Sequence, residues 1–367
     1  MRRIVHYYPG AMGNSGVTFA LWSWARVQAA SGSEVCVLHA PPAHAPREIS
    51  FVSKDHCRAL SEQSVPHRGR HRMTLRPVAL DRYLGRNDLL VLHEGWVLGN
   101  IVAAAAARRA RVPYVVMPHG VYESAWRKYL KLPRCLRDRF ERRLLEGAAA
   151  VHLFFDSEIA DVAALAPGAR FMTVPTGFDL PDERWTGGGG YLAWIGRIDP
   201  VHKGLDALVG AIARLAPDQR PMLRIRGYDY KGGIARLQSL IEERGVTEWV
   251  HLDGVIAGAE KMRFLQRADG YIHPSRWECH SIALLENLAL GVPCLVSSAI
   301  HIARTLKRSS AAVLAQPSEA GLAAALPRLA AGWPEVASRG RALIGDQFNW
   351  KILMPQFYSA IGHLGLQ

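Results

Sequence analysis

The chain has 367 residues, 49% of them apolar, and a mean hydropathy of zero. Its length suits two domains with separate cores, and no apolar run is long enough to form a membrane-spanning helix. The formal net charge is +13, with the larger basic excess in the N-terminal half. The five cysteines form no C-x-x-C pair, which favours reduced thiols and a cytoplasmic protein.

The first half alternates predicted strands and helices. Residues 4–8 read as a strand, residues 9–16 as a Gly-rich loop and residues 17–30 as a helix, an order that can bring backbone N–H groups to an anion. A tight turn alone would also explain Gly16. Further strands are expected at 34–39, 89–93, 113–117, 151–154 and 172–175, with helices at 97–110 and 157–165. This alternation predicts a doubly wound parallel sheet.

Two segments of this half do not fit the alternation. Residues 41–76 are rich in Pro, His and Arg and predict an irregular insertion with short elements. Residues 126–143 interleave eight basic residues with aromatic and apolar ones. They fit a solvated helix face, an anionic membrane surface or an anionic acceptor, and nucleic acid is the least favoured partner.

His119 lies where the strand 113–117 ends, and Gly120 lets the chain turn after it. Ligands of doubly wound sheets bind at the carboxyl ends of strands, so a functional role competes with simple packing for His119. After the strand 172–175, the segment 181–190 ends in four glycines and is expected to be a flexible connector between two domains.

The second half begins with a strand at 191–195, followed by Arg197 and, before a helix, Lys203. A guanidinium at a strand end and an ammonium at a helix start can both point into one cleft and neutralise a diphosphate. Two ordinary surface cations are the alternative. A strand at 222–226, a helix at 233–244, a strand at 250–252 leading to Gly254, and a helix at 261–267 follow.

The stretch 268–298 carries two carboxylates around a helix start. A strand at 270–273 leads to a loop with Glu278, and Ser281 can cap a helix that runs to about residue 290 and contains Glu286. Gly291 suits the helix C-terminus. The free N–H groups of 282–284 favour a phosphate, and the two carboxylates can accept sugar hydroxyls. An ordinary strand–helix unit with solvated glutamates is the alternative.

Several of these motifs together resemble one family. Glu278 and Glu286 enclose seven residues, with Pro274-Ser275 before them and the sequence ALGVP at 289–293 after them. This resembles the E-x7-E signature of retaining GT-B glycosyltransferases, family 4 in particular. The sequences GR at 196–197, KGL at 203–205, PHG at 118–120 and PTGFD at 175–179 are also similar to the family's motifs.

The resemblance implies the GT-B fold, an α/β architecture in which two doubly wound Rossmann-like domains face a cleft and the C-terminal helix crosses back to the first domain. The expected acceptor-side domain is 1–180 with 350–367, and the expected nucleotide-sugar domain is 187–349. By resemblance, Glu278 contacts the donor sugar and His119 approaches its anomeric carbon. Arg197 and Lys203 hold the diphosphate and Glu286 the ribose. The remaining donor-binding assignments are His280, Ser281, Ile282, Gly16, Gly254 and Val255.

The activity implied is transfer of a hexose-type sugar, with retention, from a nucleoside-diphosphate sugar to a glycan, lipid-linked or small-molecule acceptor. Cys279-His280-Ser281 replaces the family's Gly-Phe-Gly or Gly-Phe-Pro, so the donor sugar stays open. No Asp-x-Asp is present, so we expect no metal and no cofactor. Polysaccharide biosynthesis at the inner membrane face is expected through 126–143, with no nucleic-acid partner. A nucleotide-sugar epimerase or hydrolase, or a non-catalytic membrane- or nucleic-acid-binding protein, remains an alternative.

Overall fold

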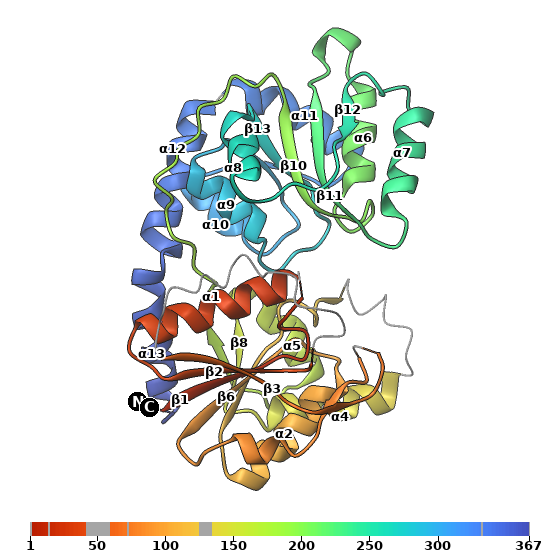
Figure 1. Cartoon of the computed structure of the whole chain (residues 1–367). Coiled ribbons are helices and arrows are strands. Elements are labelled where there is room, and N and C mark those ends of the chain that lie inside the picture. The colour runs from red at the N-terminus through yellow and green to blue at the C-terminus, as the bar shows by residue number, and fades with distance from the viewer. Residues whose placement is uncertain are drawn as a thin grey trace. The chain divides into compact units, whose positions relative to one another are not determined.

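The computed structural model describes residues 2–13, 15–41, 59–71, 73–124, 134–331 and 333–366. The chain forms two compact units, one made of Met1–Gly177 with Trp350–Gln367 and the other of Phe178–Asn349. Each unit is a parallel sheet with helices on both faces, so the predicted α/β fold is confirmed (Figure 1). Residues 42–58 and 125–133, which belong to the two irregular or basic segments of the sequence, lie outside the described residues.

The first unit contains a seven-stranded parallel sheet with the order β3-β2-β1-β6-β7-β8-β9. The order reverses beside β1, and in such sheets the ligand crevice lies at the carboxyl ends of the strands next to the reversal. The strands are β1 (Arg3–Tyr7), β2 (Val35–His39), β3 (Leu60–Ser64), β6 (Asp88–His93), β7 (Tyr114–Met117), β8 (Ala150–Leu153) and β9 (Phe171–Thr173). A short antiparallel ribbon joins β4 (His67–Arg68) and β5 (Arg76–Pro77).

Strand β3 lies within a segment that the sequence predicted to be irregular. Its sequence is LSEQS, and four of its five residues are exposed, because it is the edge strand of the sheet. A polar edge strand gives no apolar alternation, so the pattern that identifies buried strands is missing here.

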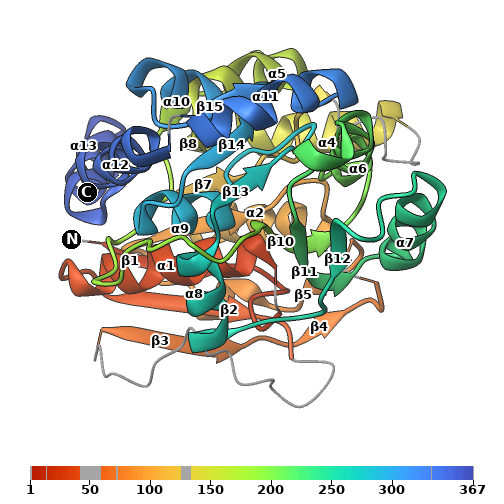
Figure 2. The ribbon, with the colours of Figure 1, turned by 90° about the horizontal axis from the view of Figure 1, so that it is seen from above.

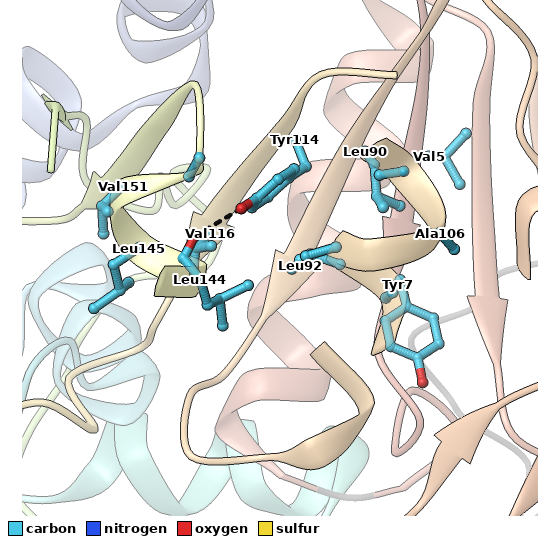
Figure 3. Close-up of a cluster of buried hydrophobic side chains, with 14 of the residues drawn as sticks. Val5, Tyr7, Leu90, Leu92, Ala106, Tyr114, Val116, Leu144, Leu145 and Val151 are labelled. Carbon is cyan, nitrogen blue, oxygen red and sulfur yellow. Dashed lines mark hydrogen bonds between the residues drawn. The ribbon is translucent and has the colours of Figure 1, made fainter. Parts of the chain in front are cut away.

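Helices cover both faces of this sheet. They are α1 (Gly16–Ala30), α2 (Leu98–Ala110), α4 (Arg134–Glu146), α5 (Ile159–Leu165) and α13 (Trp350–His363), with 3₁₀ turns at Leu80–Tyr83 and Asp156–Glu158. Against one face, Val5, Tyr7, Leu90 and Leu92 pack in an apolar core that includes Ala106 of α2 (Figure 3). At its margin the Tyr114 hydroxyl donates to the carbonyl of Leu144 at 2.9 Å.

The C-terminal helix α13 belongs to the first unit, as the GT-B fold requires. It lies beside α1 (Figure 1). The ring of Trp24 on α1 meets the edge of Trp350 at 4.8 Å and the ring of Phe357 at 5.2 Å. Gly177 lies so close to Trp350 that a Cβ there would come 2.5 Å from the indole. The last helix therefore completes the apolar packing of a sheet whose strands all lie before residue 174 in the sequence.

The second unit contains a six-stranded parallel sheet with the order β12-β11-β10-β13-β14-β15. Its strands are β10 (Leu192–Ile198), β11 (Leu223–Asp229), β12 (Val250–Leu252), β13 (Gly270–His273), β14 (Cys294–Ser297) and β15 (Val313–Ala315). Its helices are α6 (Leu205–Arg214), α7 (Gly233–Glu243), α8 (Gly258–Arg267), α9 (Ile282–Leu290), α10 (Ala303–Ser309), α11 (Glu319–Ala331) and α12 (Trp333–Leu343), with a 3₁₀ turn at Pro217–Gln219 and a π turn at Ile344–Phe348. Helix α11 lies against β14 and β15, next to α6 (Figure 2).

The segment 181–190, predicted as a flexible connector, is held along the second unit. The Trp185 backbone N–H donates to the Leu290 carbonyl at 2.9 Å, and its indole N–H to the Ala268 carbonyl at 2.7 Å. Gly188 N–H donates to the Asp269 carboxylate at 2.7 Å. The division between the units falls after Gly177, before the glycine run at 187–190. The segment 181–190 belongs to the second unit because these backbone N–H groups are paired with that unit.

Candidate functional site

Three of the predicted site residues, Arg197, Lys203 and Glu278, lie in or after the two strands where the strand order of the second unit reverses. Strands β10 and β13 are neighbours there, although β11 and β12 come between them in the sequence. The loop after β10 passes close to the loop after β13 at Gly204, which has a φ of +66° and whose missing Cβ would clash with the Pro274 carbonyl. Only glycine allows both the left-handed backbone and this approach, so the two loops are held together.

Lys203 and Glu278 form an ion pair across these loops. The Lys203 ammonium donates to Oε2 of Glu278, and both side chains are mostly buried. The hydroxyl of Ser275 lies 3.5 Å from the same oxygen. Burial raises the pKa of Glu278, but Lys203, together with the nearby His273 and His202, outweighs burial and lowers that pKa to about 2. Glu278 is therefore an ionised carboxylate that carries its own counter-ion.

His273, the last residue of β13, lies next to the Glu278 carboxylate of this pair. Its Nε2 is 3.7 Å from Oε2 of Glu278 and has no hydrogen-bond partner among the described residues. Burial lowers the pKa of His273 to about 4, so its ring is neutral at neutral pH. Nothing in the sequence distinguishes His273, because a histidine inside an apolar strand is usually a packing residue.

Arg197 is oriented by a neighbour that sequence reasoning missed. Its guanidinium lies 2.8 Å from Nδ1 of His202, whose Nε2 lies 3.0 Å from the carbonyl of Trp277. A guanidinium can only donate, so Nδ1 of His202 accepts and Nε2–H donates to the carbonyl. The His202 ring stacks on Trp277 with centroids 4.6 Å apart, and burial lowers its pKa to about 4. Arg197 is also stacked over Tyr230 at 4.1 Å.

Helix α9 begins and ends where the sequence predicts. The Ser281 hydroxyl accepts from the Leu284 N–H at 3.4 Å, Ile282 is the first helical residue, and Gly291 ends the helix at φ +83°. The first N–H groups of any helix lack partners within it, and they offer a place for an anion. His280, just before the cap, is partly buried with its ring 6.0 Å from that of Phe348.

Glu286 lies one turn inside α9 and has a different partner from Glu278. Its Oε1 is 2.6 Å from the ammonium of Lys261 on α8. The two glutamates of the E-x7-E pattern are thus each paired with a lysine from another element. Gly254 and Val255 follow β12. The Gly254 carbonyl accepts from the Gly227 N–H at 2.8 Å, and Val255 is exposed.

The other two predicted residues lie in the first unit. Gly16 is the first residue of α1, capped by Ser15, and a Cβ at Gly16 would meet no atom within 4 Å, so packing does not require glycine there. His119 follows β7 in the left-handed region at φ +56°. Its Nε2 lies 2.9 Å from Nδ1 of His93, a residue that the sequence did not single out.

Two family models match the chain. One, described as a glycosyl transferase 4-like domain, covers residues 15–177, and the other, glycosyl transferases group 1, covers residues 189–332. The chain is a group 1 glycosyltransferase of the GT-B type. A comparison with curated proteins gives no match.

Solved structures share the glycosyltransferase's fold at low identity. Sucrose-phosphate synthase from Thermosynechococcus elongatus is 17% identical with a TM-score of 0.77, covering 99% of this chain and 100% of its own. HepE from Anabaena, in complex with UDP-glucose, is 15% identical with a TM-score of 0.79 and the same coverage. WaaG, a glycosyltransferase of lipopolysaccharide biosynthesis, is 16% identical with a TM-score of 0.64 and covers 98% of both chains.

Among the residues that the structure describes, no group of three or more His, Cys, Asp or Glu side chains could hold a metal ion. None of the helices there is both long and apolar enough to cross a membrane.

Proposed function

We propose that this glycosyltransferase transfers a hexose-type sugar from a nucleoside-diphosphate sugar to an acceptor with retention of configuration and without a metal ion. The observation that carries the proposal is the ion pair between Lys203 and the ionised Glu278, at the reversal of strand order and beside the oriented Arg197. UDP-glucose is the first donor to test, because it is bound in the structure of HepE.

The ion pair suits a ligand that carries both an anionic group and hydroxyl groups that donate hydrogen bonds. A donor offers an anionic diphosphate to Lys203 and neutral sugar hydroxyls to Glu278, so binding exchanges one ion pair for two new contacts. In the reaction, the bond between the anomeric carbon and the diphosphate oxygen breaks. Lys203 and Arg197 stabilise the charge that develops on the leaving oxygen. Glu278 stabilises the positive anomeric carbon, and Glu286 binds the ribose.

The acceptor oxygen attacks the anomeric carbon from the face that the diphosphate leaves. Its proton passes to the departing phosphate oxygen, so no carboxylate nucleophile is needed and the configuration is retained. His119 would meet the donor sugar from the first unit, as the resemblance to the family implies.

A donor panel tests the function. The protein is incubated with UDP-, GDP- and dTDP-sugars, with EDTA present and with or without glycan and lipid acceptors, and nucleotide release is measured. Release that requires acceptor, with an α-configured product from an α-linked donor by NMR, supports the proposal. Release without acceptor supports an epimerase or hydrolase instead, and inversion or a need for metal contradicts the mechanism.

Two lysine variants test whether the diphosphate of the donor binds at Lys203. Lys203→Ala should lower kcat/KM by about 100-fold or more, since it removes a cation from the leaving group. Lys307→Ala removes an exposed lysine from α10 of the same unit and should leave activity unchanged. Equal activity in both variants would place the diphosphate elsewhere.

We also propose that the acceptor is approached at an anionic membrane surface. Helix α4 exposes Leu136 and Phe140, 61% and 42% accessible, and the exposed arginines Arg139, Arg142 and Arg143 lie on the same helix. Apolar side chains among cations favour insertion at a charged interface. Vesicles containing phosphatidylglycerol should sediment the protein, whereas phosphatidylcholine vesicles should not, and Leu136→Ser with Phe140→Ser should weaken the binding. If neither kind of vesicle sediments the protein, the proposed approach at a membrane surface is wrong.

A further inference from the structure

Three histidines from neighbouring strands of the first unit form an unbroken hydrogen-bonded row. His6 lies in β1, His93 ends β6, and His119 follows β7. Nδ1 of His6 is 2.8 Å from Nε2 of His93, and Nδ1 of His93 is 2.9 Å from Nε2 of His119. At the inner end, Nε2 of His6 is 2.7 Å from Oε1 of Gln28 on α1. The row thus runs from a buried amide to a residue at the carboxyl edge of the sheet.

The sheet register explains the row. His6 pairs with Val91, two residues before His93, and β6 and β7 are neighbours, so His119 follows next to His93. Alternate residues of a strand point to opposite faces. Because Tyr7 and Leu92 face the apolar core on the α2 side (Figure 3), His6 and His93 face the other side, where α1 brings Gln28.

The two inner rings are uncharged. His6 and His93 are fully buried. Burial lowers the pKa of His6 to about 4 and that of His93 well below its ordinary value. A neutral imidazole donates from one nitrogen and accepts at the other. All bonds in the row must therefore run in one direction, and the group at the buried end decides which.

Gln28 offers its carbonyl oxygen at that end, and an oxygen of this kind can only accept. His6 then donates from Nε2 and accepts at Nδ1 from Nε2–H of His93, which in turn accepts at Nδ1 from Nε2–H of His119. The amide nitrogen of Gln28 has no hydrogen-bond partner among the described residues. Turning the amide over would reverse every bond, so Gln28 is the element that sets the polarity.

We propose that Gln28, His6 and His93 are positioning residues that lock His119 in one protonation form, with its proton on Nε2 and Nδ1 as an acceptor. The consequence for the sugar rests on the proposed role of His119 at the donor. There, the fixed proton position makes Nδ1 of His119 an acceptor for a sugar hydroxyl. A sugar hydroxyl can donate to a ring nitrogen that accepts, whereas an anionic group has no proton to donate to it. The row would thereby favour a neutral hydroxylated sugar.

The tautomers are measured directly by two-bond ¹H–¹⁵N NMR on the full chain with labelled histidine. The expected result is the Nε2–H form for His6, His93 and His119. In His93→Phe and in Gln28→Met, which cut the row at its middle and its buried end, the ¹⁵N shifts of His119 should move toward a mixture of the two tautomers. Gln28→Glu keeps an acceptor-only end and should preserve the Nε2–H form of His119.

His152 provides the matched control. It is a buried histidine of β8 whose ring meets Trp24 and whose Nε2 lies 2.8 Å from the Val174 carbonyl, outside the row. His152→Phe should cost stability without moving the ¹⁵N shifts of His119. A wild-type His119 with its proton on Nδ1, or shifts unchanged in Gln28→Met, would overturn the lock.

Steady-state kinetics distinguish the tautomer lock of His119 from the proposed role of His119 at the donor sugar. With an active donor, Gln28→Met and His93→Phe should lower kcat/KM by about 5- to 10-fold, the effect of one hydrogen bond, with Gln28→Glu closer to wild type. If the NMR result holds but kcat/KM does not change, the lock stands and the role of His119 at the sugar is wrong. If no donor turns over, the proposed function fails while the tautomers still decide the lock.

Discussion

The charge of Glu278 depends on a residue 75 positions away in the sequence. A carboxylate this buried would favour its protonated form in isolation. The Lys203 ammonium, with smaller contributions from His273 and His202, reverses that preference, and the pKa of Glu278 falls to about 2. The same pairing that prepares the site for a donor should therefore contribute to the stability of the folded protein, and this contribution should depend on pH.

The sign of that dependence follows from the direction of the shift. Because burial, which raises the pKa of Glu278, is outweighed by Lys203 together with His273 and His202, the pKa falls from 4.5 to about 2 on folding. The stabilisation is complete above about pH 4.5 and is lost as the pH falls from there toward 2. Between pH 6 and pH 3.5, wild type should lose about 1 kcal/mol more free energy of unfolding than Glu278→Gln in urea titrations.

Glu243→Gln is the control for this measurement, because Glu243 is exposed on α7. It should retain the pH dependence of the wild type. A Glu278→Gln variant that loses stability with the wild-type slope over this range would show that the Lys203 pair does not hold the carboxylate ionised.

His202 contacts Arg197, and we expect it to act by orienting that guanidinium. His202→Phe keeps a ring to stack on Trp277 but removes the acceptor at 2.8 Å from the guanidinium. Arg197 would then be less firmly oriented, so KM for the donor should rise about 5-fold with a smaller change in kcat. His251→Phe, a partly exposed histidine of β12, should change neither constant. A fall in kcat with an unchanged KM would argue against a positioning role.

Among the elements, the buried strands and most helices were predictable because their apolar patterns are local. Helix α9 runs over Ile282–Leu290, as its cap and its glycine indicate. Strand β3 was missed because an exposed edge strand has a polar sequence. Helix α13 was placed in the first unit by resemblance alone, since nothing within residues 350–363 indicates which sheet its apolar face covers.

The packing of α13 leads to an element-scale prediction. Phe357 is buried against Trp24, whereas Ile352 on the same helix is 36% exposed. Phe357→Ala should lower the free energy of unfolding of the first unit by about 3–5 kcal/mol, since it removes a buried aromatic ring from a close-packed face. Ile352→Ala should cost about 1 kcal/mol or less. Urea unfolding followed by Trp fluorescence measures both, and similar costs would contradict the assigned packing.

At the scale of the whole molecule, two regions of the second unit compete for a ligand. The proposed donor site lies at the carboxyl ends of β10 and β13. A cavity of about 600 Å³ lies near the amino ends of β10 and β11 and is lined by residues that include Leu192, Leu215, Arg220 and Met222. Chemistry favours the first region, because the ion-paired lysines and the helix start are found there.

Hydrogen exchange on the intact chain distinguishes the two regions. Saturating UDP should slow exchange by at least about 5-fold in peptides covering 196–204 and 278–284, by mass action on local opening. Peptides from α13, in the other unit, serve as the internal reference. Protection at 215–222 in place of these loops would move the nucleotide to the amino-end cavity and remove the basis for the donor site.

Local chemistry in the sequence determined most of the buried strands, the caps and turns, and the residue types at each strand end, because helix caps, glycines and apolar periodicity act over a few residues. The tertiary structure decided which of those side chains meet. Lys203 reaches Glu278 across 75 residues, and His6 reaches His93 across 87, because the strand order makes distant segments neighbours. A pattern along one chain does not contain that order, so the counter-ion of Glu278 and the histidine row became visible only in the folded protein.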